Sequence, residues 1–183
     1  MQSFSFLYKL TQKFPIWQQD HDKWVERFSQ KFFSRPGHEW ITRNNFLLRV
    51  FQSFFQHLDL ESLLFLSYSN GLIIIPSNGK LSCAVHSRQE YVIIVFPEMM
   101  KLLKSAVPNY GLAILAHELG HIVLNHSQRN LELLASQKES DLFAMKLGYG
   151  FELLQLLEDH LHIEECKLRH QFLQQKLGLQ QQS

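Results

Sequence analysis

The sequence predicts an α+β fold for a single domain of 183 residues, with helices before and after a short sheet. Three observations support this prediction. Aromatic and aliphatic residues recur at helical spacing in the first third, three runs rich in β-branched residues follow, and helical patterns then return. We expect residues 1–69 to be helical, 70–96 to form the sheet, 97–178 to be helical again and 179–183 to be a frayed tail.

The first third carries two helical stripes of large apolar side chains. Trp24, Phe28 and Phe32 recur every four residues, and a second stripe with spacings of three and four runs from Leu47 to Leu58. The segment 35–37 reads Arg-Pro-Gly, which disfavours a continuous helix. We therefore expect separate amphipathic helices, each with its aromatic face in the core.

The middle segment changes from helical to strand patterning. Its apolar runs cover 72–75, 81–85 and 91–96, and turn-forming residues separate them at 76–79 and 87–90. We expect a small three-stranded sheet, antiparallel or mixed, with the strands paired as a meander.

Four helices are expected after the sheet. Pro97 can begin a short one through Lys104, and Pro108 precedes a strongly apolar one. Gly148 ends a third helix, and the last is expected from about Phe151 towards Lys176.

The apolar helix after Pro108 carries a His-Glu-x-x-His motif at His117, Glu118 and His121. Residues four apart lie on one helix face, so the two histidines can bind one zinc ion while Glu118 acts as a general base. The surrounding residues are apolar, and an unpaired polar cluster there would be costly without a metal. The motif predicts a zinc-dependent peptidase that hydrolyses peptide bonds with a metal-activated water.

The segments 115–126 and 139–149 resemble the gluzincin zinc metallopeptidases, especially the HtpX and CAAX prenyl protease group. A second resemblance is to the ImmA/IrrE-like peptidases. The second segment, Glu-Ser-Asp-Leu-Phe-Ala-Met-Lys-Leu-Gly-Tyr, is similar to the families' ExEADxxAxxLG stretch. The resemblance implies a zincin-like fold, a Zn²⁺ cofactor and a protein or peptide substrate.

The third zinc ligand departs from these families, whose first Glu of ExEAD corresponds here to Gln137. Gln137 and Asp141 share one narrow helical arc, whereas Glu139 lies on the far side of that helix. Asp141 combines a suitable ligand type with a suitable position, although in the families this Asp orients a ligand histidine. We favour Asp141 as the ligand, with Gln137 able to hold the metal through a water, and all three residues remain open.

His126 is a further histidine close to the motif. It lacks the HExxHxxGxxH spacing of a third metzincin ligand, so we interpret it as a histidine at the helix end, facing the helix dipole.

Composition narrows the partners and the compartment. The formal net charge of +1 disfavours nucleic acid as a partner. Cys83 and Cys166 lack the spacing of a metal pair, and the chain shows neither a secretion signal nor an apolar run long enough to span a membrane. We expect a cytoplasmic protein without a transmembrane segment, and its oligomeric state stays open.

Three functions fit these observations. The leading one is a zinc endopeptidase of the gluzincin type. The others are an ImmA/IrrE-like regulatory peptidase that cleaves a repressor, and a non-catalytic binding or regulatory protein on a peptidase fold. Gln137 favours the last interpretation, and Glu118 opposes it because a site without catalysis does not need that residue.

Overall fold

The computed structural model describes residues 21–68, 71–77, 83–86 and 90–179 of the chain. They group into two compact units, one through Ile73 and one from Ile74 onward. Each unit is described by itself below. The organisation as a single domain stays a prediction.

The first unit is helical in its described part, as the sequence predicted. Its helices are α2 (His21–Phe33), α3 (Glu39–Thr42), α4 (Asn45–Gln56) and α5 (Leu60–Tyr68). The Asn44 side chain caps α4 by accepting hydrogen bonds from the backbone N–H groups of Phe46 and Leu47 at 3.0 and 3.1 Å. The expected helical character of residues 1–20 lies outside the described residues.

Aromatic rings form the core of this unit. Phe28 and Phe32 both meet Phe55 edge to face, with ring centroids 5.0 and 4.9 Å apart. The fully buried His38 stacks on Phe32 at 3.9 Å, and its Nδ1 donates a hydrogen bond to the Phe32 carbonyl at 2.6 Å. The predicted aromatic stripes are therefore core residues.

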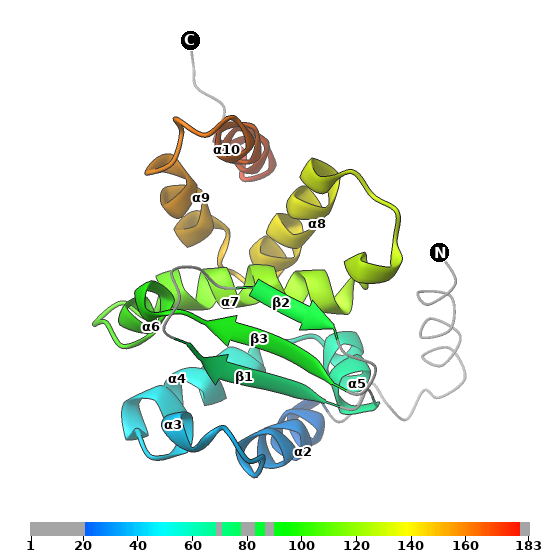
Figure 1. The fold of residues 1–183 in the computed structure, drawn as a ribbon, viewed down its shortest axis with the longest axis vertical. Coiled ribbons are helices and arrows are strands. Elements are labelled where there is room, and N and C mark those ends of the chain that lie inside the picture. Colours follow the sequence, from blue (N-terminus) through cyan, green and yellow to red (C-terminus); the bar gives the residue numbers. More distant parts are fainter. Residues whose placement is uncertain (1–20, 69–70, 78–82, 87–89, 180–183) are drawn as a thin grey trace. The chain divides into compact units, whose positions relative to one another are not determined.

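The sheet contains β1 (Leu72–Pro76), β2 (Cys83–His86) and β3 (Tyr91–Val95) in the order β1-β3-β2. β2 and β3 are antiparallel, with Cys83 paired to Ile94 and His86 to Tyr91. β1 points the same way as β3 in Figure 1, and the backbone N–H of Ser77 donates to the Val95 carbonyl at 2.8 Å.

The predicted meander order is therefore wrong, because β3 lies in the middle of the sheet. Its side chains Ile93 and Val95 are fully buried, as suits a central strand. Alternating apolar residues identify strands, but the neighbour of each strand depends on packing that the sequence pattern does not contain.

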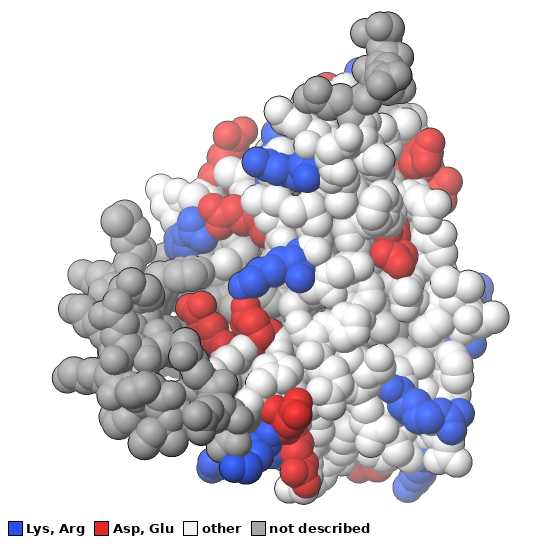
Figure 2. Space-filling view, turned by 180° about the vertical axis from the view of Figure 1, so that it is seen from behind, with Lys and Arg blue, Asp and Glu red and all other residues white. Residues whose placement is uncertain are grey.

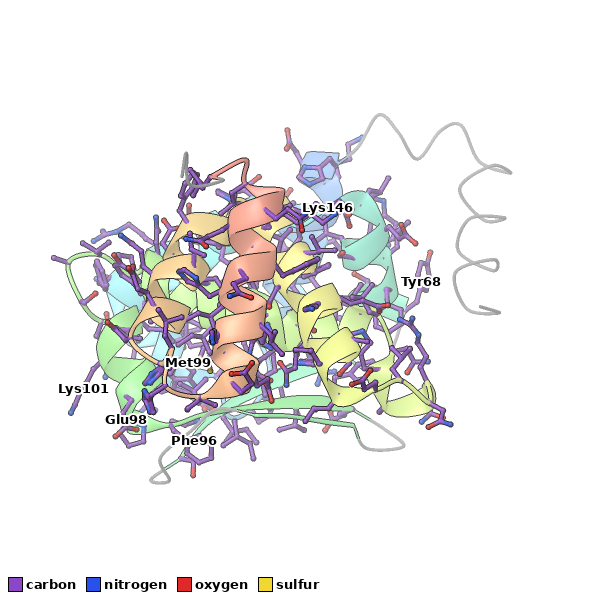
Figure 3. The ribbon with its side chains drawn as sticks, turned by 90° about the horizontal axis from the view of Figure 1, so that it is seen from above. Tyr68, Phe96, Glu98, Met99, Lys101 and Lys146 are labelled. Carbon is purple, nitrogen blue, oxygen red and sulfur yellow. The ribbon has the colours of Figure 1, made fainter. Side chains whose placement is uncertain are left out.

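The second unit continues with α6 (Pro97–Leu103), α7 (Asn109–Val123), the 3-10 turn η2 (His126–Gln128), α8 (Leu133–Lys146), α9 (Gly150–Glu158) and α10 (Glu164–Lys176). In Figure 1, α7 lies between the sheet and the helices α8 to α10, and it contacts both layers. Pro97 begins α6 as predicted, with Met99 buried and Glu98 and Lys101 at the outer edge of that helix in Figure 3. The motif helix α7 is thus the central helix of this unit.

The expected single helix from about Phe151 to Lys176 is wrong, because residues 159–163 form a turn between α9 and α10. The apolar stripe of α9 ends in this turn, where residues 158–164 are exposed. The turn brings α10 back against α8. As a result, residues of α10 can reach the side chains that α8 presents to α7.

Gly148 ends α8 as predicted, with a φ angle of +92°. The backbone N–H groups of Gly148 and Tyr149 donate to the carbonyls of Met145 and Ala144, both at 3.0 Å. This is the Schellman pattern, in which a left-handed residue closes the last helical turn.

On the face of the molecule drawn in Figure 2, acidic and basic side chains of the described residues are scattered among a larger area of other residues. None of the described helices is both long and apolar enough to cross a membrane. The tail predicted for 179–183 falls outside the described residues from position 180 onward.

Candidate metal centre

His117 and His121 lie one turn apart on α7 and turn their ring nitrogens towards each other. Their Nε2 atoms are 3.2 Å apart, and the two rings are nearly perpendicular, at 80°. His117 is buried, with 7% of its surface exposed. The same-face arrangement predicted from the motif is therefore present in the structure.

Gln137 comes from α8 to the same point. Its Oε1 lies 2.9 Å from Nε2 of His117. This approach depends on close packing of the two helices at Gly120, where an added Cβ would lie 3.0 Å from Cα of Ser140 and 3.1 Å from Cβ of Phe143. A glycine at this position allows α8 to come near enough for Gln137 to reach the histidines.

Asp141 lies on the opposite side of the His117 ring. Its Oδ1 accepts a hydrogen bond from His117 Nδ1 at 2.8 Å and one from Arg169 Nη2 at 2.7 Å, while Oδ2 accepts from Arg169 Nε at 2.9 Å. Burial alone would raise the pKa of Asp141, but the hydrogen bonds from His117 and Arg169 outweigh it and hold the pKa below its usual value. Asp141 is thus an ionised, fully buried group that binds the far nitrogen of His117.

The other ring nitrogen of His121, Nδ1, contacts a third histidine, His126. His121 Nδ1 lies 2.8 Å from Nδ1 of His126, and His126 Nε2 donates to Oε2 of Glu139 at 3.0 Å. Arg129 in turn binds both oxygens of Glu139, at 2.5 and 3.0 Å. Hydrogen bonding to Arg129 is the main reason why the pKa of Glu139 is lowered.

Lowered pKa values keep the rings of His121 and His126 neutral at pH 7. Burial, together with smaller contributions from the neighbouring His117 and His126, lowers the pKa of His121 to about 4. Burial also lowers the pKa of His126.

These partners decide where the ring protons lie. A carboxylate only accepts, so the His117 proton is on Nδ1, facing Asp141 at 2.8 Å; Arg169 Nη2, 3.3 Å from the same nitrogen, donates at the shorter distance of 2.7 Å to Asp141. The neutral His126 donates from Nε2 to Glu139, which leaves its Nδ1 to accept a proton from His121 Nδ1. With one proton on each ring, both motif histidines present bare Nε2 lone pairs to each other, next to the Oε1 acceptor of Gln137.

Three acceptors that face one another without a proton repel unless a cation lies between them, and this donor set fits a zinc ion. Nitrogens about 2.0–2.1 Å from a tetrahedral zinc are about 3.3 Å apart, close to the 3.2 Å observed between the two Nε2 atoms. Within the described part of the chain, no group of three His, Cys, Asp or Glu side chains is arranged to hold a metal. The third group at this point is the amide of Gln137.

The structure brings together the two motif histidines and the three candidates for the third ligand, in differing roles. Glu118 is half-buried on α7, beside His117. Of the three candidates for the third ligand, only Gln137 has a hydrogen-bond contact with one of the two Nε2 atoms that face each other. Asp141 contacts Nδ1 of His117, and Glu139 contacts Nε2 of His126. The geometry therefore favours Gln137 over Asp141, the ligand that we preferred from the sequence.

Sequence reasoning missed the roles of Arg169 and Arg129, and it gave His126 a different one. Arg169 is 28 residues from Asp141 and reaches it only because the turn after α9 returns α10 to α8, so no local pattern marks it. For His126 a signal exists, since Asn125 ends α7 in the left-handed conformation with φ +54° and turns the chain back. An asparagine directly after the motif helix, followed by a histidine, could have indicated that the chain turns back towards His121 at this point.

The chain was compared with known proteins in three ways. The comparison with curated proteins and the comparison with solved structures gave no match. In the third, the family model described as Peptidase family M48 matches residues 87–168, which is less than half of the chain. The matched segment contains the motif helix, Gln137, Asp141 and the segment 126–139. Over residues 87–168 the chain is therefore similar to Peptidase family M48, and this match supports a zinc metallopeptidase family.

Proposed function

We propose that the chain is a zinc-dependent endopeptidase of the gluzincin type. The single observation that carries the proposal is the convergence of Nε2 of His117, Nε2 of His121 and the amide oxygen of Gln137, with Glu118 next to His117 on the same helix. The similarity to Peptidase family M48 supports the same activity. The same similarity is the reason to expect a protein or peptide as the substrate.

His117, His121 and Gln137 would hold the metal. When bound, zinc supplies a polarised water and a Lewis acid for the peptide carbonyl. Glu118 accepts a proton from the attacking water and donates it to the leaving amine. Asp141, anchored by Arg169, keeps the His117 proton on Nδ1 so that Nε2 remains a ligand.

Gln137 makes the donor set unusual, since three neutral ligands leave the full double charge of zinc at the site. An amide is a weaker donor than a carboxylate, so we expect lower zinc affinity than a His₂Glu site would have. This feature also favours the alternative of a non-catalytic protein on a peptidase fold. The ImmA/IrrE-like role has no specific support in the geometry.

The first test is the zinc content and zinc affinity of the purified chain and its Gln137 variants. We expect about one zinc per chain in the wild type, tighter binding in Gln137→Glu and weaker binding in Gln137→Ala. Glu158→Gln, a change at an exposed position of α9, serves as the control and should bind like the wild type. No zinc in the wild type after reconstitution would contradict the proposal.

The second test separates an enzyme from a binding protein. Glu118→Gln should keep its zinc and lose cleavage of an unfolded protein such as casein, because the amide cannot take the proton. Loss of about 100-fold or more is expected from the removal of a general base, with Glu158→Gln again as the control. Cleavage that persists in Glu118→Gln would contradict the general-base role of Glu118, and a zinc-loaded wild type that cleaves nothing would favour the non-catalytic alternative.

A further inference from the structure

His126, Glu139 and Arg129 form a connected chain of side chains behind His121, here called the relay. No step of the proposed hydrolysis uses these residues. Arg129 and Glu139 are about one third exposed, at 34% and 37% of their side-chain surface, whereas the His126 side chain is 7% exposed. The relay thus runs from a surface ion pair to a buried ring beside the candidate metal centre.

The two motif histidines have similar anchors built in different ways. On His117, a carboxylate that is itself bound by an arginine contacts Nδ1 directly, through Asp141 and Arg169. On His121, the same carboxylate–arginine pair is present as Glu139 and Arg129, but the His126 ring lies between it and the metal-facing ring. Each histidine therefore has one anionic anchor and one cation that holds the anchor in place.

The backbone makes this second arrangement possible. Asn125 leaves α7 in the left-handed conformation, and η2 follows at once, so His126 folds back to meet His121 five residues earlier. The pair packs edge to face at 76°, with ring centroids 4.9 Å apart. Glu139 reaches His126 from α8, the helix that also supplies Gln137.

We propose that His126 is a positioning residue that fixes the proton of His121 on Nδ1, and that Glu139 and Arg129 act through it. This role rests on the proposed metal site. A neutral imidazole has only one N–H, so a ring whose Nδ1 donates must leave Nε2 free for a metal. Without an acceptor at Nδ1, the His121 proton can move to Nε2, where it competes with zinc.

The test compares His126→Leu, His126→Gln and Glu139→Gln with the wild type. His126→Leu removes the acceptor, whereas the amide of His126→Gln can accept from His121 and donate to Glu139. Glu139→Gln keeps a hydrogen-bond acceptor for His126 but removes the negative charge. Gln128→Leu, a change at an exposed position of η2, and Glu158→Gln are the matched controls.

Two readouts follow in these variants. Long-range ¹H–¹⁵N correlation spectra of the metal-free protein report the His121 tautomer, and competition with a zinc chelator reports the affinity. We expect the Nδ1–H form in the wild type, loss of that preference in His126→Leu, and zinc affinity about 10- to 100-fold weaker, as for other groups that orient a metal-binding histidine. His126→Gln should restore much of both properties, and Glu139→Gln should lie between.

A folded His126→Leu with the wild-type tautomer and zinc affinity would overturn the proposal. Equal losses in His126→Leu and His126→Gln would also overturn it, because a merely structural role for the ring predicts no rescue by the amide. Absence of zinc binding in the wild type would instead contradict the proposed function. The His121 tautomer in the metal-free protein would then still decide whether the relay orients this ring.

Discussion

Breaking the ion pair between Asp141 and Arg169 should destabilise the second unit strongly. Asp141 is fully buried, and the Arg169 side chain is 11% exposed. Two hydrogen bonds join them, at 2.7 and 2.9 Å. Asp141→Asn would place an amide N–H₂ against one of the Arg169 donors and leave Glu165, 3.5 Å from Nη1 and 36% exposed, as the remaining counter-charge of that buried cation.

The magnitude follows from this burial. Removing one partner of a buried pair costs about 3–5 kcal/mol when the other charge is left uncompensated, and the contact of Arg169 with Glu165 places Asp141→Asn near the lower end, at about 3 kcal/mol. Arg169→Met should cost a similar amount for the same reason, since it leaves the Asp141 carboxylate with His117 alone. The double variant carries neither charge, so its loss should be smaller than the sum of the single losses by at least about 2 kcal/mol.

Urea unfolding of the three variants and the wild type measures these free energies. Lys167→Met, at an exposed position on the same helix α10, is the matched control and should change stability by less than about 0.5 kcal/mol. A cost below about 1 kcal/mol for Asp141→Asn, or strictly additive single effects, would refute the assignment of a coupled buried pair.

Two other predictions concern packing and pH. Gly120→Ala should destabilise the protein by about 1–3 kcal/mol, because the new methyl group would meet the backbone of Ser140 at 3.0 Å and push α8 away. The same displacement should weaken zinc binding. An unchanged midpoint of urea unfolding would contradict the close approach of the two helices. Burial lowers the pKa of His38, so the unfolded chain takes up a proton below pH 6.5 before the folded chain does. Stability should therefore fall as the pH drops below about 6.5, by up to about 1.4 kcal/mol per pH unit, and His38→Gln should lose this component. Equal slopes for wild type and variant between pH 7 and 5 would count against it.

Local patterns predicted the helices and strands of the described residues well. The stripe that ends at Phe32 lies in α2, and the stripe that ends at Leu58 lies in α4 and the two residues after it. Pro97 and Gly148 mark helix boundaries as expected. These features succeed because helix and strand periods, caps and left-handed turns depend on residues close in sequence. The strand order and the break between α9 and α10 failed because both depend on how separate elements pack.

In the candidate site too, some residues could be identified from local spacing and others only from the packing of separate helices. His117, Glu118 and His121 are identified by spacing alone, since four residues make one turn of a single helix. Gln137 and Asp141 are also one turn apart on one face of α8, so their spacing cannot tell which of them meets Nε2 of His117 and which meets Nδ1. The level at which α8 crosses α7 at Gly120 decides that.

The sequence by itself therefore determined the motif, its helix and the two histidines that face each other. Only the tertiary structure decided that Gln137 lies at Nε2 of His117 and that a carboxylate and an arginine lie behind each of the two histidines. The physical reason is the range of the interactions involved. Helical geometry acts over one turn, whereas Arg169 reaches Asp141 across 28 residues through the packing of α10 on α8.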